Sequence, residues 1–212
     1  MNPSRRALAE QLRLYFVCGT PNTKDILQTV ETALRCGVTC FQFREKGKEA
    51  LYGDKKEAMA RALQTLCRSY DVAFIINDDV DLAERINADG VHIGQDDADA
   101  ARVRERIGPG KWLGVSVHTL EEAAAAIDYA DYVGIGPVYP TNSKADAGAV
   151  NGTVLIRQVR AMYRELPIVG IGGILPEHVP MIRQDGADGV AVISAIASAP
   201  DVAMATRRFA CL

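Results

Sequence analysis

Short apolar runs alternate with helical segments along the chain, and this alternation limits the possible folds more than any other feature. The clearest unit spans residues 74–97, where the apolar runs 74–76 and 91–93 flank a helical segment at residues 81–87. Runs rich in Ile and Val that end at Asp, Asn or Gly are typical of buried strands. The unit therefore predicts a strand–helix–strand crossover between parallel strands.

Eight such apolar runs occur, each followed by a helical segment, and a short extra helix is expected before the first of them, at residues 4–12. The predicted strands are residues 14–17, 38–43, 74–76, 91–93, 112–115, 132–135, 168–171 and 189–193, and the predicted helices after them are 23–35, 51–69, 81–87, 98–107, 120–129, 154–164, 176–184 and 201–209. Eight units of this kind predict an α/β chain folded as a single-domain (β/α)8 TIM barrel over residues 1–212. A doubly wound open sheet is the alternative, but no GxGxxG motif follows the first strand.

A weak internal repeat supports this count. Ala-Asp occurs at residues 88–89, 130–131 and 187–188, each time where a helix leads into a strand. We interpret the repeat as a shared helix-to-strand turn with a structural role, and not as three functional sites.

Charge and cysteine usage limit the compartment and the partners. The formal net charge of -3 gives no sign of nucleic-acid binding or of an anionic membrane surface, although local cations can still bind an anionic substrate. No apolar run reaches membrane-spanning length, and the N-terminal residues lack the apolar core of a signal peptide. Five cysteines without a CxxC motif are typical of buried free thiols in a reducing compartment. We therefore expect a cytoplasmic protein; the sequence does not indicate its oligomeric state.

In a barrel of this type the functional residues lie at the C-terminal ends of the strands. The residues expected there combine cations, hydroxyls, amides, carboxylates and glycines, without a nucleophile–base pair. They are Gln42, Arg44, Lys46, Asn77, Asp78, Gln95, Asp97, Ser116, Thr141, Ser143, Lys144, Gly172, Gly173, Ile193 and Ser194. This set predicts a site that holds phosphates and a metal ion.

The metal prediction concerns the Asp residues that follow two neighbouring strands. Carboxylate oxygens suit Mg²⁺, which is commonly shared with substrate phosphates. The alternative is that these residues cap helices, and residues 74–97 alone favour it. Placement at the barrel rim shifts the interpretation to Asp78 and Asp97 as metal ligands, while Asp79 and Asp96 remain helix-start or loop residues.

Two separate anion-binding regions are expected at this rim. Gln42, Arg44 and Lys46 alternate along one strand, so they point to the same side. Gly172-Gly173 and Ile193-Ser194 lie at the C-terminal ends of the last two predicted strands, where barrels usually bind phosphate. The alternatives are solvated charges in the first region and a tight turn in the second.

The histidines do not form a catalytic motif. His92 lies within an apolar strand and is interpreted as a satisfied core or rim residue. His118 is ambiguous, and His178 is expected on the surface of an outer helix. Neither a Ser/His/Asp arrangement nor a zinc-ligand spacing is present.

Together these motifs resemble the thiamine phosphate synthase family. The matching stretches run in order over nearly the whole chain: LYFV (14–17), FQFREK (41–46), INDD (76–79), ADGVHIGQDD (88–97), LGVSVHT (113–119), ADYVGIGPVYPTNSK (130–144), PIVGIGGI (167–174) and GADGVAVISAI (186–196). The family's loop commonly reads T-x-T-K, and here Ser143 stands at the second hydroxyl position and keeps the hydroxyl.

The resemblance implies a reaction. A (β/α)8 barrel joins 4-amino-2-methyl-5-hydroxymethylpyrimidine diphosphate to 4-methyl-5-(2-hydroxyethyl)thiazole phosphate, or to its carboxylated form, and gives thiamine phosphate and diphosphate. The implied path is dissociative, through a pyrimidinylmethyl cation, and needs no side-chain nucleophile. The implied cofactor is Mg²⁺.

The resemblance also implies roles for individual residues. Gln42, Arg44, Lys46 and Asn77 would hold the pyrimidine diphosphate, and Ser116 would touch the pyrimidine. Asp78 and Asp97 would ligate Mg²⁺. Thr141, Ser143 and Lys144 would lie on a mobile loop within residues 136–150, with Lys144 on the diphosphate; Gly173, Ile193 and Ser194 would bind the thiazole phosphate. Arg44, Lys46 and Lys144 would act catalytically on the leaving diphosphate.

Two alternatives remain. A related thiazole tautomerase would keep the glycine phosphate site but would not need the cations and the carboxylate pair. A non-catalytic barrel that senses a phosphorylated ligand would need none of the chemistry. The synthase is favoured over both alternatives, because the expected cations, amide and carboxylates are all present. They are Arg44, Lys46, Asn77, Asp78, Asp97 and Lys144.

Overall fold

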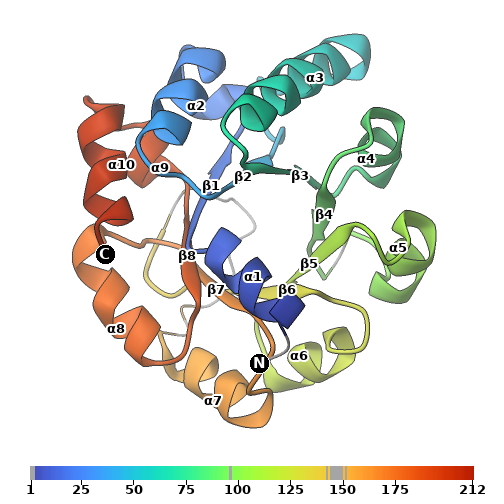
Figure 1. Cartoon of the computed structure of the whole chain (residues 1–212), viewed down its shortest axis with the longest axis vertical. Helices are drawn as coiled ribbons and strands as arrows, with labels where there is room; N and C mark the ends of the chain where they lie inside the picture. Colours follow the sequence, from blue (N-terminus) through green and yellow to red (C-terminus); the bar gives the residue numbers. More distant parts are fainter. Residues whose placement is uncertain (1–2, 96, 142, 144–149, 151) are drawn as a thin grey trace.

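The eight strands form a closed parallel barrel in sequential order, as predicted (Figure 1). The computed structural model describes residues 3–95, 97–141, 143, 150 and 152–212. The strands are β1 (Leu14–Cys18), β2 (Cys40–Phe43), β3 (Ala73–Asn77), β4 (Gly90–Ile93), β5 (Trp112–Val117), β6 (Tyr132–Ile135), β7 (Ile168–Ile171) and β8 (Gly189–Val192). The (β/α)8 architecture is therefore confirmed.

A ring of helices surrounds the barrel. These helices are α2 (Ile26–Arg35), α3 (Gly53–Ser69), α4 (Val80–Ile86), α5 (Ala100–Ile107), α6 (Leu120–Ala126), α7 (Val154–Met162), α8 (Val179–Gln184) and α10 (Val202–Ala210). Two short 3-10 helices, η1 (Thr20–Asn22) and η2 (Pro176–His178), and a four-residue helix, α9 (Ser194–Ala197), add to them. Several predicted helices began too early, because Asp25 and Asp99 cap α2 and α5 and are not part of them.

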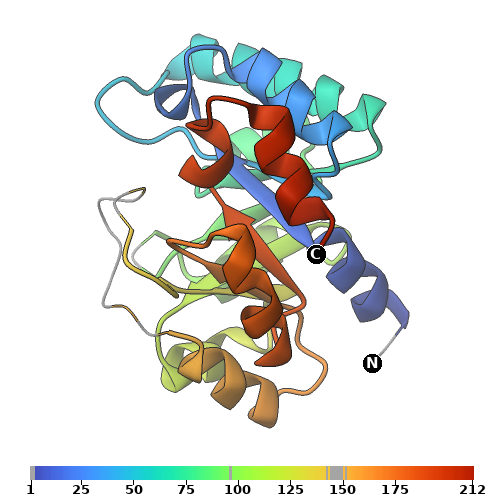
Figure 2. The same cartoon turned by 90° about the vertical axis from the view of Figure 1, so that its left-hand side faces the viewer.

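The predicted N-terminal helix is confirmed as α1 (Pro3–Gln11), and it closes one end of the barrel. Leu8 and Leu12 pack against the inward-facing side chains of the strands, among them Tyr15 and Tyr132. Figure 1 shows α1 crossing the centre of the barrel, and Figure 2 places it at the end opposite to the loop that joins β2 to α3. Apolar side chains thus fill the end of the barrel at which the strands begin. A ligand must therefore enter from the end at which the strands finish.

The Ala-Asp repeat has the structural role that the sequence indicated. In each copy the Asp side chain accepts a hydrogen bond from the backbone N–H near the start of the preceding strand. The pairs are Asp89 with Phe74, Asp131 with Leu113 and Asp188 with Ile168, each at 2.8 Å. Each carboxylate therefore fixes the start of one strand against the next.

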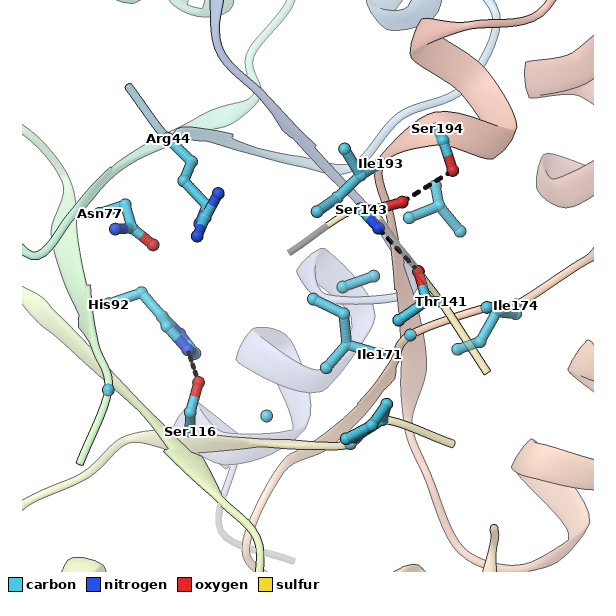
Figure 3. A pocket seen from close by; sticks show the side chains of 18 of the residues that line it. Arg44, Asn77, His92, Ser116, Thr141, Ser143, Ile171, Ile174, Ile193 and Ser194 are labelled. Atoms are coloured by element: carbon cyan, nitrogen blue, oxygen red, sulfur yellow. Dashed lines mark hydrogen bonds between the residues drawn. The ribbon is translucent and has the colours of Figure 1, made fainter. Parts of the chain in front are cut away.

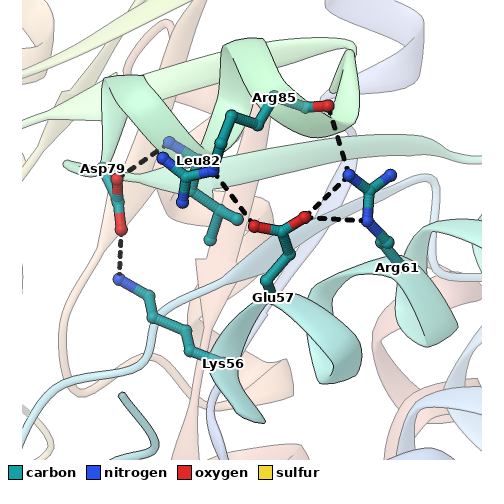
Figure 4. Close-up of polar contacts among 6 residues, drawn as sticks. All are labelled: Lys56, Glu57, Arg61, Asp79, Leu82 and Arg85. Carbon is teal, nitrogen blue, oxygen red and sulfur yellow. Dashed lines mark hydrogen bonds and ion pairs between the residues drawn. The ribbon is translucent and has the colours of Figure 1, made fainter. Parts of the chain in front are cut away.

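Polar contacts between α3 and α4 hold the loop after β3 in place (Figure 4). The Asp79 side chain accepts from the Leu82 N–H at 2.9 Å and pairs with Lys56 at 2.7 Å. Partial burial acts to raise the pKa of Asp79, but the Lys56 ammonium and the Leu82 N–H outweigh it and lower the pKa. Asp79 is thus a helix cap, as interpreted from the sequence, and it anchors the residue that follows Asp78.

The cysteines are buried free thiols for the most part, as the sequence indicated. All five cysteines are free, and four of them are buried. In the part of the chain that the structure describes, no helix combines the length and the apolar character needed to cross a membrane.

Candidate active site

A cavity of about 1060 Å³ opens at the C-terminal ends of the strands, where the sequence placed the functional residues. Most of the predicted site residues line it: Arg44, Lys46, Asn77, Asp78, Gln95, Asp97, Ser116, Thr141, Ser143, Gly172, Gly173, Ile193 and Ser194. Gln42 does not, because its side chain is buried in the barrel and donates to Tyr15 Oη at 2.8 Å. Lys144 lies outside the described residues. Residues that are scattered along the sequence therefore lie together around one cavity, as expected for the C-terminal strand ends of a (β/α)8 barrel.

The two predicted metal carboxylates lie beside one ammonium group. Lys46 Nζ pairs with Asp78 and lies 3.3 Å from Asp97 Oδ1. Asp78 also accepts from the Asn77 amide at 2.5 Å, and Asp97 accepts from the Gly94 N–H at 3.0 Å. The sequence suggested that these residues would meet, and the structure brings them together from the ends of β2, β3 and β4.

The electrostatics of this group are those of two like charges around a cation. Burial raises the pKa of Asp78 above its ordinary value, although Lys46 opposes the shift. Partial burial acts in the same direction on Asp97, but it is outweighed, and the pKa of Asp97 is lowered. The lowering comes from a hydrogen bond that the protonated form of Asp78 can donate, from the attraction of Lys46 and from the Gly94 N–H. Despite some burial, the two carboxylates raise the pKa of Lys46. An added cation would relieve the repulsion between the carboxylates.

The donor set fits Mg²⁺. This ion is commonly bound through one or two carboxylates, with water and substrate phosphate oxygens as its remaining ligands. Asp78 and Asp97 supply two carboxylates at the cavity wall. Within the described residues no group of three or more His, Cys, Asp or Glu side chains is placed to hold a metal, so a closed all-protein site is not formed there.

Glu45 supports the segment that carries Arg44 and Lys46, and it was not among the predicted site residues. Its buried carboxylate accepts from the Thr20 N–H at 2.8 Å, from the Thr20 hydroxyl and from the Leu51 N–H at 2.7 Å. These bonds tie the β1–α2 loop to the segment that carries Arg44 and Lys46. Successive side chains of a strand point to opposite faces, and Arg44 and Lys46 were predicted to point to the same face. Glu45, which lies between them, was therefore expected to point to the opposite face, and this is the sequence feature that could have identified it.

We expect Glu45→Gln to lower the free energy of unfolding by about 1–3 kcal/mol, because an amide would leave buried N–H donors without good acceptors. Urea unfolding measures the change. Glu49→Gln is the matched control, since Glu49 is exposed in the same loop. An equal, small effect of both substitutions would contradict the supporting role of Glu45.

The opposite wall of the cavity is built from glycines and hydroxyls. Gly172 and Gly173 have φ angles of 99° and 63°, and a Cβ at Gly173 would lie 2.5 Å from the Pro140 carbonyl oxygen. Ser143 and Ser194 share a hydrogen bond of 2.9 Å. These positive φ angles and this close approach favour glycine.

Figure 3 shows the hydroxyls of Thr141, Ser143 and Ser194 across the cavity from Arg44 and Asn77. The two regions that the sequence predicts to bind anions therefore lie on different sides of the cavity. The short helix α9 was not predicted, because a helix of four residues shows no helical periodicity in the sequence. It begins at Ser194, so its first N–H groups lie at this wall.

The three histidines differ in their surroundings. His92 is buried and bonded to Tyr132 and Ser116, which confirms that it is satisfied. His118 lines the cavity, and its backbone N–H donates to Glu122 at 2.6 Å. His178 was expected on the outer surface, but it is half-buried because its ring stacks on Tyr139 at 3.9 Å between centroids.

The cavity of this parallel barrel has a carboxylate pair and cations on one side and glycines and hydroxyls on the other. This arrangement is typical of enzymes that act on phosphorylated small molecules. Comparison with known proteins narrows this class. The family model described as thiamine monophosphate synthase matches residues 14–196. The chain belongs to this family, and it is an enzyme of the transferase class.

Individual relatives agree with the family match. A thiamine-phosphate synthase of Geobacillus thermodenitrificans is 56% identical over 196 residues, covering 92% of this chain and 88% of the relative. One of Bacillus licheniformis is 52% identical over 208 residues, covering 97% and 92%. The solved thiamine phosphate pyrophosphorylase of Pyrococcus furiosus superposes with a TM-score of 0.84 at 34% identity and covers 95% of both chains. The resemblance found in the sequence motifs is therefore confirmed.

Proposed function

We propose that this protein is a Mg²⁺-dependent thiamine phosphate synthase. It would transfer the pyrimidinylmethyl group of 4-amino-2-methyl-5-hydroxymethylpyrimidine diphosphate to the nitrogen of 4-methyl-5-(2-hydroxyethyl)thiazole phosphate, or of its carboxylated form. The observation that carries the proposal is the pair Asp78 and Asp97 with Lys46 across the cavity from the Gly173–Ser194 wall. One region suits a metal-bound diphosphate, and the other suits a monophosphate.

The basic region would bind and stabilise the diphosphate. Negative charge builds up on the leaving oxygen as the C–O bond breaks, and preorganised cations stabilise such charge. Arg44 and Lys46 line this part of the cavity, and Lys144 would add a third cation from its loop. When bound to Asp78 and Asp97, Mg²⁺ would supply several kcal/mol of further charge stabilisation.

The pyrimidine would lie between this region and the cavity floor. Its amino group can release electrons toward the methylene carbon, so a dissociative, carbocation-like path is proposed. Asn77 and Ser116 line the cavity at suitable positions for the ring. Gln42 was predicted to hold the pyrimidine diphosphate together with Arg44 and Lys46. Its side chain is buried beside Tyr15, so its contact would be with the pyrimidine end of this substrate.

The thiazole phosphate would occupy the other wall. Backbone N–H groups near Gly173 and the hydroxyl of Ser194 suit a phosphate, with Thr141 and Ser143 beside them. Ile171, Ile174 and Ile193 line the same side, and their apolar surfaces would keep water from a cationic intermediate (Figure 3). The thiazole nitrogen would then form the new C–N bond, so no side-chain nucleophile is needed.

We expect diphosphate release only when both substrates and Mg²⁺ are present, with EDTA stopping turnover and added Mg²⁺ restoring it. Thiamine phosphate and diphosphate are measured together. Activity that survives EDTA would overturn the metal assignment. A tautomerase would convert a thiazole phosphate isomer without the pyrimidine substrate, and a sensor would bind ligand without product.

We also propose that residues 1–212 form one domain and that the protein acts in the cytoplasm. The buried free thiols support a reducing compartment.

A further inference from the structure

A chain of polar side chains runs through the barrel interior and ends at the cavity. It consists of Gln42, Tyr15, Tyr132, His92 and Ser116, which we call the interior relay. Its links are Gln42 Nε2 to Tyr15 Oη at 2.8 Å, Tyr15 Oη to Tyr132 Oη at 2.8 Å, Tyr132 Oη to His92 Nδ1 at 3.2 Å and His92 Nε2 to Ser116 Oγ at 2.9 Å. Five strands contribute one residue each, so the relay depends on the closed barrel.

The relay is buried except at its last member. Tyr132 is 0% exposed, Gln42 3% and His92 7%. Among the five residues only His92 and Ser116 line the cavity, and Ser116 is half-buried there (Figure 3). Buried polar groups cost free energy unless they are hydrogen-bonded, so the relay holds its members in defined orientations.

A glycine makes the central link possible. Gly114 on β5 pairs with His92 on one side and with Tyr132 on the other. A Cβ at position 114 would clash with both His92 Nδ1 and Tyr132 Oη. Because Gly114 has no side chain, residues of β4 and β6 meet across β5 in one layer of the interior.

The direction of donation follows from the first link. The Gln42 amide nitrogen can only donate, so Tyr15 Oη accepts and has one proton left to give. Burial raises the pKa of Tyr15 and of Tyr132 well above the ordinary value, so both phenols keep their protons. Tyr15 therefore donates to Tyr132, and Tyr132 donates to His92 Nδ1.

An imidazole that accepts at Nδ1 carries its proton on Nε2 when it is neutral. His92 Nε2 then donates to Ser116 Oγ, and the Ser116 proton is left to point into the cavity. Gln95 fixes the same residue from outside, because its amide donates to the Ser116 carbonyl oxygen at 2.6 Å.

We propose that the interior relay makes Ser116 a hydrogen-bond donor to the substrate and so determines which edge of the pyrimidine is accepted. A donor selects an acceptor such as a ring nitrogen and disfavours an amino group at the same point. This inference rests on the proposed function for the identity of the ligand. Tyr15, Tyr132 and His92 are positioning residues, since they act through Ser116.

The tautomer of His92 tests the direction of the relay in the substrate-free protein. The chain holds three histidines, so ¹⁵N spectra of the imidazoles can be assigned with His118→Gln and His178→Gln. We expect His92 as the Nε2–H tautomer in the otherwise unchanged protein. A predominant Nδ1–H tautomer would overturn the proposal, and this readout does not depend on any enzymatic reaction.

Tyr132→Phe tests the effect on the substrate, because it removes the donor to His92 Nδ1 and keeps the buried ring. We expect a mixture of His92 tautomers and a rise of about tenfold in KM for the pyrimidine diphosphate, the size of one lost hydrogen bond. The KM for thiazole phosphate should not change. Tyr163→Phe, at the end of α7 and outside the barrel, is the control for removal of a phenol hydroxyl.

A double-mutant cycle separates positioning from a general loss of structure. Ser116→Ala should raise the KM for the pyrimidine diphosphate by a similar factor. Adding Tyr132→Phe to Ser116→Ala should then raise it little further, because the relay no longer has an end to position. If the two substitutions raise the KM for the pyrimidine diphosphate independently, so that their factors multiply in the double variant, the proposal is overturned.

Discussion

Asp78→Asn is expected to lower kcat by roughly 10³-fold, because a metal-stabilised leaving group depends on several kcal/mol of charge stabilisation. Asn is the sharper substitution than Ala, since Asp78 has a φ of 61° and Asn adopts this left-handed conformation more readily. The side-chain size is kept, and only the carboxylate charge is lost. Steady-state formation of thiamine phosphate over a range of Mg²⁺ concentrations measures the change, and the apparent Mg²⁺ affinity should fall as well.

The neighbouring residue supplies the control. Asp79→Asn removes one carboxylate at the adjacent position, but Asp79 faces Lys56 and caps α4. Asn is also a good N-cap, so the fold and the activity should be kept. Equal kcat losses in the two variants would show that the effect is structural, and near-normal activity of Asp78→Asn would remove Asp78 from the metal pair.

The fold was predictable because its determinants are local. The sequence shows each strand as a short apolar run, and parallel strands buried on both faces need such runs. The Ala-Asp turns that end at Asp89, Asp131 and Asp188 are also visible as a repeat. Their hydrogen bonds to the preceding strand confirm that the repeat is structural.

The site was predictable to the extent that it lies at strand ends. The barrel rule alone placed Asp78, Asp97 and Lys46 together, and the structure confirms that they meet. The rule does not predict which residues near the C-terminal end of a strand line the cavity and which are buried in the barrel interior. Gln42 was therefore predicted at the rim beside Arg44 and Lys46, whereas the structure buries its side chain against Tyr15. Its contact with the pyrimidine diphosphate stays a prediction.

Contacts between strands that are distant in the sequence could not be predicted from the sequence pattern. Tyr15 and Tyr132 are 117 residues apart in sequence, and each alone is an ordinary inward-facing aromatic residue. Nothing in the pattern around His92 shows that Gly114 opens a path to Tyr132. The polar interior of the barrel thus depends on register across the closed sheet, and a single sequence does not display that register.

Ser194→Asp is expected to raise the KM for thiazole phosphate by at least about 100-fold, while the KM for the pyrimidine diphosphate stays the same. The new carboxylate would stand beside Ser143, at the wall proposed for the monophosphate. At an effective dielectric of about 20, two unit charges about 4 Å apart repel each other by about 4 kcal/mol. Partial exposure of the site reduces this value, which leaves a loss of about two orders of magnitude in affinity.

Ser194→Asn separates charge from size, because Asn has the same shape as Asp and no charge. Its KM for thiazole phosphate should rise far less than that of Ser194→Asp, and raising the ionic strength should narrow the difference because salt screens an exposed charge. If Asn and Asp weaken binding equally, the effect is steric and not electrostatic. If neither substitution changes the KM, the phosphate binds elsewhere, and the Gly173–Ser194 wall loses its proposed role.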